Sequence, residues 1–336
     1  MKKIIAALLS LIIMLFPSIT AGPNSRRFVK TEYGQLTNAD ASANTQAVYD
    51  YICSVYHHGI ITGQQESNWY ENPDYEMDYI EQVTGKLPAI RGFDFIYDNF
   101  DDVVTRSTQW WQRGGIVTIC WHCSSNFDKG YVESLHTDIA DWDAALTQGT
   151  PEYDALVAGM DKAAAALKQL DEAGVPVLWR PFHEVGGDWF WWSRGGARNF
   201  VKLWRIMYTR YTDVWNLDNL IWVCGYQAKP QLPELWYPGD GYVDIAGADS
   251  YYGGTQAALY HRVKLFIGER KPICFHENGT IPDMDALDLW NTDWCYFMTW
   301  HSEFLMDDAW NTKENIIKAY NHEYAITLDE LPSFTG

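Results

Sequence analysis

The chain has 336 residues, of which 15% are aromatic, and a formal net charge of −19 at pH 7. Such a negative charge repels nucleic acids and anionic lipid surfaces, so neither is expected as a partner, whereas a neutral polymer is not repelled. The length is compatible with two domains, but α/β barrels often reach it as one domain. We expect a monomer.

Residues 1–22 have the pattern of a secretory signal peptide. Lys2 and Lys3 precede the apolar stretch Ile4 to Phe16, and the small residues at 20–22 form a cleavage region. The apolar stretch is short for a membrane span, and the sequence has no other candidate span. We therefore expect an exported protein, periplasmic or secreted, in which residues 23–336 form a single domain.

Helical patterns and apolar runs alternate along the first half of the mature chain. The expected helices cover about 41–57, 74–84, 99–113 and 156–170. The last of these is the clearest, because Leu156, Met160, Ala163, Leu167 and Leu170 recur at helical spacing before Gly174. The expected strands are 60–65, 87–95 and 116–120, and a polar insertion covers 128–151.

The second half continues the alternation. Further strands are expected at 175–179, 220–224, 243–248, 272–275 and 295–299. Further helices are expected at about 200–211 and 255–267, and a last one at 312–320 closes the chain. Eight short apolar runs separated by helices favour a parallel sheet closed as a (β/α)8 TIM barrel. A doubly wound open sheet is the alternative, but no G-x-G-x-x-G follows its first strand.

Six cysteines are too few for a disulfide scaffold in a chain of this length. Cys120 and Cys123 have the spacing of a redox motif, but they follow a strand instead of beginning a helix. No second cysteine pair supports a zinc site. We expect buried thiols or one incidental disulfide, and neither a metal nor a cofactor.

Polar and aromatic residues follow the apolar runs. They are Gln64, Glu66, Arg91, Asp94, His122, His183, Glu184, Tyr226, Asp249, Tyr251, His276, Glu277, Trp300, His301 and Glu303. In a barrel, all of these positions face one bowl at the carboxyl ends of the strands. Acids, histidines and tryptophans without a phosphate-binding glycine loop suit a neutral, ring-shaped ligand such as a sugar. Many of the 17 tryptophans can instead pack in the core, as is expected for Trp204.

The stretch from Trp179 to Trp192 carries the strongest signal. An apolar strand stops at Arg180, and His183-Glu184, two glycines and four aromatic residues follow. A core strand that runs into an ordinary loop is the alternative. Glu277 follows the seventh expected strand, and retaining glycoside hydrolysis needs two such carboxyls about 5 to 5.5 Å apart. Either glutamate could instead bind a hydroxyl group or, with a neighbouring histidine, a metal.

These motifs resemble glycoside hydrolase family 26, the β-mannanases with catalytic glutamates on strands four and seven. The R-P-x-H-E run and the W-F-W-W segment are present in full. Further similarity lies at Trp121-His122 with Asn126, at Asp249-Ser250-Tyr251, at Glu277 and at 298–301. One departure is that the family often has glycine before the nucleophile and T-G after it, whereas Glu277 lies between His276 and Asn278.

The resemblance implies a role for each matching residue. Glu184 would be the general acid/base and Glu277 the nucleophile, held by a hydrogen bond from Tyr251. His183 would orient the nucleophile and the sugar. The other implied substrate-binding residues are His122 and Trp189 at the cleavage point, Trp300 as stacking floor and Arg180 as support below the nucleophile. For Arg180 and Trp189, packing of the loop is the alternative.

The implied reaction is hydrolysis of β-1,4-mannosidic bonds in mannan, galactomannan and glucomannan. A β-1,3/1,4-glucanase or xylanase would share both glutamates and the fold. A non-catalytic sugar-binding barrel should lack one glutamate, and a metal-dependent sugar isomerase should cluster its ligands more closely. Internal cleavage and release of disaccharides both stay open, because they depend on loops such as 128–151.

Overall fold

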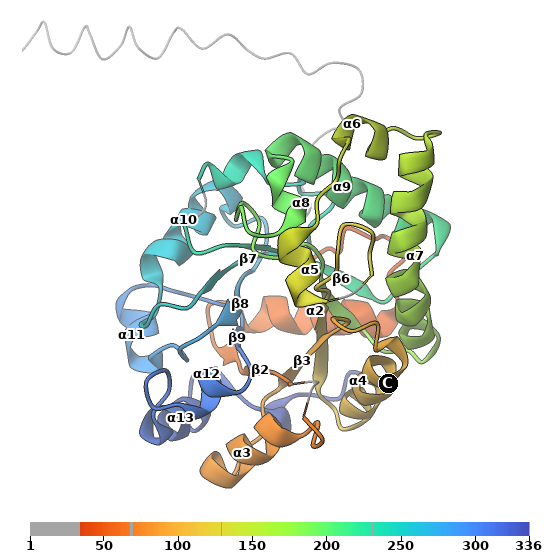
Figure 1. Cartoon of the computed structure of the whole chain (residues 1–336). Coiled ribbons are helices and arrows are strands. Elements are labelled where there is room, and N and C mark those ends of the chain that lie inside the picture. Colours follow the sequence, from red (N-terminus) through yellow and green to blue (C-terminus); the bar gives the residue numbers. More distant parts are fainter. Residues whose placement is uncertain (1–33, 68–69, 129, 230, 336) are drawn as a thin grey trace, which may run out of the picture. The chain divides into compact units, whose positions relative to one another are not determined.

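A computed structural model describes residues 34–335, except 68, 69, 129 and 230. The expected signal peptide lies outside the described residues. Eight parallel strands close into a barrel in chain order (Figure 1), which confirms the predicted (β/α)8 barrel and excludes the open sheet. The barrel strands are β2 (Gly63–Gln65), β3 (Ile90–Asp94), β4 (Ile116–Cys120), β5 (Val177–Arg180), β6 (Leu220–Tyr226), β7 (Ile245–Ser250), β8 (Ile273–Asn278) and β9 (Phe297–Thr299).

One long helix precedes the first barrel strand, five lie between barrel strands, and one follows the last. They are α2 (Ala43–Val55), α3 (Tyr75–Thr84), α4 (Phe100–Gln112), α7 (Pro151–Glu172), α9 (Ala197–Thr209), α10 (Ala257–Ile267) and α13 (Lys313–Tyr320). Each overlaps a helix expected from the sequence. Short helices lie in the connections: α5 (Tyr131–His136), α6 (Trp142–Ala145), α8 (Trp191–Arg194), α11 (Met284–Leu289) and α12 (Glu303–Met306). The polar insertion 128–151 therefore contains α5 and α6.

In helix α7, the apolar residues at helical spacing form the face that packs against the rest of the protein. Thr150 caps it by accepting a hydrogen bond from the Tyr153 amide, and Pro151 occupies its first turn. The apolar positions predicted from their spacing, Leu156 to Leu170, are all buried. Burying a leucine side chain of this kind contributes roughly 1.5–3 kcal/mol, so the apolar stripe fixes α7 in its place against α4.

The predicted first strand is divided in two. Residues Ile60–Ile61 form β1, which pairs in parallel with β10 (Ala325–Ile326) outside the barrel, and only β2 enters the barrel. Glycine at position 63 lets β2 approach β9 closely, because a Cβ there would lie 2.4 Å from the Phe297 carbonyl oxygen of β9. The expectation that the helix at 312–320 closes the chain is wrong, since β10 and a turn at Leu328–Glu330 follow it.

The aromatic segment after β5 is mostly core. Phe190, Trp191 and Trp192 are buried, and only Trp189 is exposed, at 38%. Trp191 donates to the Cys123 carbonyl and Trp192 to the His183 carbonyl. These residues therefore anchor the β5–α8 connection to its neighbours instead of presenting an aromatic wall to solvent.

The six cysteines are all free, and every one except Cys53 is buried. The expectation of buried thiols is therefore confirmed, and the incidental disulfide is not formed. Among the helices that the structure describes, none has the length and apolar character needed to cross a membrane.

Candidate active site

A cavity of about 760 Å³ opens at the carboxyl ends of the barrel strands. Both glutamates singled out in the sequence line it, Glu184 after β5 and Glu277 within β8. The other lining residues are Gln65, Glu66, Asp94, Ile96, Tyr97, His122, Tyr131, Phe190, Tyr251, Trp300, His301, Phe304 and Trp310. The volume and the mixed aromatic and acidic lining suit a small part of a sugar chain.

Glu277 is held from two sides. The Tyr251 hydroxyl donates to one carboxylate oxygen at 2.6 Å, and an Arg180 guanidinium nitrogen lies 3.3 Å from the other. The register between β7 and β8 shifts so that Ala248 pairs with Phe275 but Asp249 pairs with Glu277. His276 is the extra residue of this bulge, and bulges re-aim the side chains beside them. The fully buried glycine at 225 leaves room for His276, because a Cβ there would lie 2.1 Å from Nε2.

Glu184 has a different environment. Its backbone is left-handed, with φ of 54°, and the next residue donates its amide to the Gly225 carbonyl of β6. The Trp189 indole donates to its carboxyl group. Burial and then the negative charge of Glu277 raise the pKa of Glu184 to about 7. Glu184 therefore keeps its proton up to near neutral pH.

Asp249 forms a carboxyl pair with Glu184. Asp249 is almost fully buried at the end of β7, where its carboxyl interacts with that of Glu184. Burial, followed by the charges of Glu184 and Glu277, raises the pKa of Asp249 well above its usual value. Two adjacent carboxyls cannot easily both be ionised, so the pair retains a proton that either side chain can carry.

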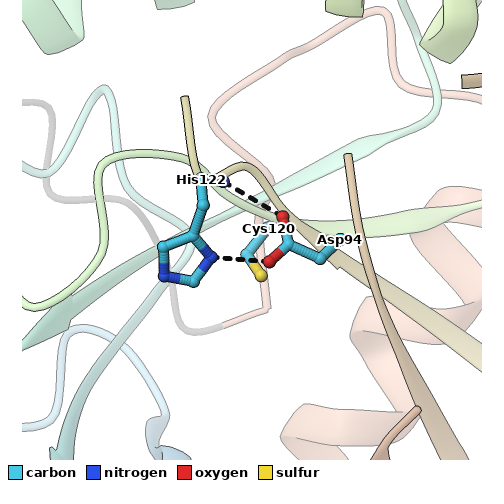
Figure 2. A group of neighbouring side chains, drawn as sticks. All are labelled: Asp94, Cys120 and His122. Atoms are coloured by element: carbon cyan, nitrogen blue, oxygen red, sulfur yellow. Dashed lines mark hydrogen bonds and ion pairs between the residues drawn. The ribbon is translucent and has the colours of Figure 1, made fainter. Parts of the chain in front are cut away.

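His122 is fixed by Asp94 on the neighbouring strand (Figure 2). Asp94 accepts from the His122 backbone amide at 3.0 Å and from Nδ1 at 2.5 Å. Burial lowers the pKa of His122, but the Asp94 carboxylate outweighs it and the net pKa is raised. The other ring nitrogen, Nε2, lies 3.1 Å from Nε2 of His183. Burial and His122 lower the pKa of His183, so we infer that His122 donates and a neutral His183 accepts.

Asp94, Cys120 and His122 also bring three potential metal ligands within 4.8 Å of one another (Figure 2). Their chemistry fits a metal poorly. Both Asp94 oxygens already accept from His122, and burial raises the pKa of the Cys120 thiol, whereas a metal needs the thiolate. Cys120 lies 3.6 Å from the Phe93 carbonyl as a weak donor. We interpret the group as the support that fixes the His122 ring.

The remaining predicted site residues lie at different depths. Trp300 lines the cavity, 6.2 Å between ring centroids from His122. Arg180 is buried beneath Glu277 and also contacts His276 and Gln65, at 3.1 and 3.4 Å. His183 lies behind His122 and does not line the cavity, and its ring contacts His122 instead of Glu277. Trp189 lies at the rim beside Glu184.

Several lining residues were missed in the sequence. Tyr131 comes from α5 in the polar insertion, and Phe304 and Trp310 come from the connection after β9. Their loops carry no periodic pattern, so nothing in the sequence indicated that they return to the bowl. Asp249 was recognised at a strand end, but its pairing with Glu184 depends on how β5 and β7 face each other across the barrel mouth.

Comparison with known proteins agrees with this geometry. The sequence profile of glycosyl hydrolase family 26 matches residues 37–330. A mannan endo-1,4-beta-mannosidase of Thermothelomyces thermophilus is 33% identical over 94% of this chain and 67% of its own length. Mannan endo-1,4-beta-mannosidase B of Piromyces sp is 32% identical over 94% of this chain, which spans only 57% of that relative.

Two solved structures have the same fold. A ruminal GH26 endo-beta-1,4-mannanase superposes with a TM-score of 0.83 at 32% identity, covering 90% of this chain and 72% of that one. A beta-mannanase from a symbiotic protist of the termite Reticulitermes speratus, solved with a gluco-manno-oligosaccharide, gives 0.82 at 31% identity, covering 89% and 98%. This chain is therefore an enzyme that belongs to glycosyl hydrolase family 26.

Proposed function

We propose that the enzyme hydrolyses β-1,4-mannosidic bonds in mannan, galactomannan and glucomannan by double displacement with two glutamates. The observation that carries the proposal is the contrast between the two carboxyls in one cavity. Burial and the charge of Glu277 raise the pKa of Glu184 to about 7, whereas Glu277 is held by a hydroxyl and a guanidinium. Two carboxyls in contrasting environments are suited to separate acid and nucleophile roles.

In the first step, the Glu277 carboxylate attacks the anomeric carbon. The bond from that carbon to the bridging oxygen breaks, and the proton of Glu184 moves to the leaving oxygen. The product is a glycosyl ester on Glu277. Tyr251, whose hydroxyl lies 2.6 Å from the nucleophile, keeps it oriented during the attack.

In the second step, ionised Glu184 takes a proton from a water molecule. The water oxygen attacks the anomeric carbon and displaces Glu277, which leaves as a carboxylate. Trp189 donates to Glu184, and this hydrogen bond steadies the carboxyl in both protonation states. The sugar at the cleavage point meets Trp300 and His122, whose ring is fixed by Asp94.

The substrate is tested by a panel of polysaccharides. Mannose carries an axial hydroxyl at C2, and a site with fixed hydrogen-bonding groups discriminates strongly against a sugar that leaves them unpaired. We expect reducing-sugar release from linear β-mannan, galactomannan and glucomannan to be at least about 100-fold faster than from xylan or mixed-linkage β-glucan. Faster release from the β-glucan than from all three mannans would instead assign a glucanase.

The mechanism is tested by the configuration of the first product. Two successive displacements at one carbon retain its configuration, whereas direct attack by water inverts it. We expect proton NMR of a mannohexaose digest to show the β-anomer before mutarotation. An initial α-anomer would contradict a glycosyl ester on Glu277 and imply a single displacement.

We also propose that the enzyme acts outside the cytoplasm. The charged and apolar pattern of residues 1–22 supports export. Mannan is a polymer that is too large to enter a cell intact, so export brings the enzyme to its substrate.

A further inference from the structure

Arg194, the last residue of α8, joins two connections at the carboxyl ends of the barrel strands. Its guanidinium donates to the carbonyls of Asp188 and Trp189, at 3.3 and 2.6 Å, in the connection between β5 and α8. It also donates to the carbonyl of Thr137 at 2.8 Å and to that of Leu135, at the end of α5. A guanidinium carries five N–H donors in a rigid plane, so it holds these carbonyls in fixed directions. We call this set of hydrogen bonds the Arg194 clamp.

The connection after β5 carries a direct partner of the proposed acid/base. The Trp189 indole donates to the Glu184 carboxyl group. The ring lies at the rim and is 38% exposed, so packing covers only part of it. Glycine at position 187 leaves room for the ring, because a Cβ there would lie 2.5 Å from it. Arg194 holds the same residue by its backbone carbonyl, and the direction of the indole therefore depends on the clamp.

The other connection is the polar insertion that contains α5. Tyr131, at the start of α5, lines the catalytic cavity, and its ring lies 5.3 Å from that of His122 between centroids. The last carbonyls of a helix have no partner within the helix. Arg194 supplies donors to two carbonyls at the end of α5. The insertion is thus tied to the connection that carries Trp189.

The insertion has further anchors that do not involve the clamp. The Ser125 amide donates to the Thr137 hydroxyl at 2.8 Å. Trp142 in α6 stacks on Trp191 with 6.3 Å between ring centroids. Removing the clamp should therefore loosen the connection after β5, while the insertion stays attached to the barrel.

We propose that Arg194 is a positioning residue of the enzyme, which holds the Trp189 backbone so that the indole N–H stays directed at the Glu184 carboxyl group. This inference rests on the proposed function, in which Glu184 gives a proton in the first step and takes one in the second. Both transfers need a carboxyl group in a fixed direction. The insertion 128–151 then serves the reaction as the outer support of the clamp.

The clamp should also affect the titration of Glu184. Burial and the charge of Glu277 raise the pKa of Glu184, and the hydrogen bond from Trp189 opposes them by stabilising the carboxylate. When the indole is loosened, the pKa of Glu184 should rise further, so that the acid form persists to higher pH. The other titratable groups that act on this carboxyl stay in place when Arg194 is replaced, and they are Asp249, Glu277, His122, Tyr131 and Tyr251.

The test is the pH dependence of kcat/KM on mannohexaose for Arg194→Ala and Arg194→Lys. The alkaline decline of both variants should move upward by about half to one pH unit, the equivalent of one lost hydrogen bond. On the acid side, kcat/KM should fall about tenfold, because the carboxyl group is no longer fixed. Lysine keeps the positive charge, but its compact ammonium cannot span both connections. Arg194→Lys is also the variant to read if the alanine variant does not fold.

A second comparison separates positioning from charge. Trp189→Phe removes the indole N–H and should itself move the alkaline decline upward. Because Arg194 acts through Trp189, replacing Arg194 in the Trp189→Phe background should cause no further shift. A simple loss of positive charge would instead give the same shift in both backgrounds and no shift in Arg194→Lys.

Arg205 of α9 offers a matched control. It also donates to a backbone carbonyl, that of Pro238, at 2.8 and 2.6 Å, and it is not among the residues that line the cavity. Arg205→Ala should keep the wild-type pH profile. An unchanged decline in Arg194→Ala, a shift that is missing from Arg194→Lys, or the same shift in the Trp189→Phe background overturns the inference. A wild-type enzyme without hydrolysis of mannohexaose overturns the proposed function as well, and this outcome is distinct from a failure of the clamp alone.

Discussion

Replacement of Glu277 by alanine should remove hydrolysis of both polysaccharide and aryl glycosides, by about four orders of magnitude or more. The physical reason is that no glycosyl ester can form. Arg180 and Tyr251 lie on this carboxylate, at 3.3 and 2.6 Å. Arg180 has no oxygen, and burial raises the pKa of the Tyr251 phenol well above its usual value, so the phenol stays protonated and does not replace the carboxylate. A good leaving group does not help, because the missing group is the nucleophile and not the acid. Initial rates on galactomannan and on an aryl β-mannobioside measure the effect.

Two controls separate this chemistry from unfolding. Glu277→Gln keeps the shape of the side chain and should be as inactive as Glu277→Ala, with a melting temperature close to that of the wild type. Glu172→Ala, at the exposed end of α7, should keep full activity. A Glu277→Ala enzyme that retains a tenth of the wild-type rate on aryl mannobioside would show that another group attacks the sugar.

Much of the fold could be predicted from the sequence, because a parallel barrel repeats one simple pattern. The barrel strands are buried on both faces, and most of them appear as short apolar runs like that of β5, whereas the long helices have apolar stripes like that of α7. The division of residues 60–65 into β1 and β2 could not be predicted. It depends on pairing with β10, a two-residue strand more than 260 positions away that no local pattern marks.

The site residues that could be predicted from the sequence are those that lie close to the end of a barrel strand. Glu184, Glu277, His122, Tyr251 and Trp300 follow barrel strands directly or lie within them, and all five line the cavity. His183 was predicted to orient the nucleophile and the sugar, and in the structure its ring contacts His122, because adjacent residues of an irregular turn point in different directions. Tyr131, Phe304 and Trp310 lie on connections, whose paths are set by packing and not by periodicity.

The protonation states of Glu184 and Asp249 depend on the assembled barrel. Asp249 and Glu184 lie 65 positions apart in the sequence, and only the closure of the barrel brings their carboxyls close enough to raise each other's pKa. Their titration belongs to the pair, with Glu277 as the charged neighbour that raises both pKa values. A single sequence position therefore could not reveal that Glu184 is protonated at the pH where it is needed.

Glu184→Ala should separate the two kinds of substrate. Polysaccharide hydrolysis should fall about 10²- to 10⁴-fold, the range that general acid catalysis contributes, because the sugar leaving group needs a proton. Aryl β-mannobioside should still form the ester on Glu277, since its leaving group needs little protonation. Added azide should then accelerate turnover and yield a β-mannosyl azide, because the cavity left by the side chain admits a small anion next to the ester.

The pH profile identifies the same residue independently. Glu184, with its pKa raised to about 7, holds its proton below that pH and loses it above. The wild-type kcat/KM on polysaccharide should therefore be highest on the acid side and fall tenfold per pH unit as the pH rises beyond about 7. This alkaline decline should disappear when Glu184→Ala turns over the aryl substrate, because no acid remains to be deprotonated. If the decline persisted unchanged in the variant, or if the variant kept near wild-type polysaccharide activity, the proton would come from another group. Asp249, whose carboxyl interacts with that of Glu184, would then be the next acid to replace.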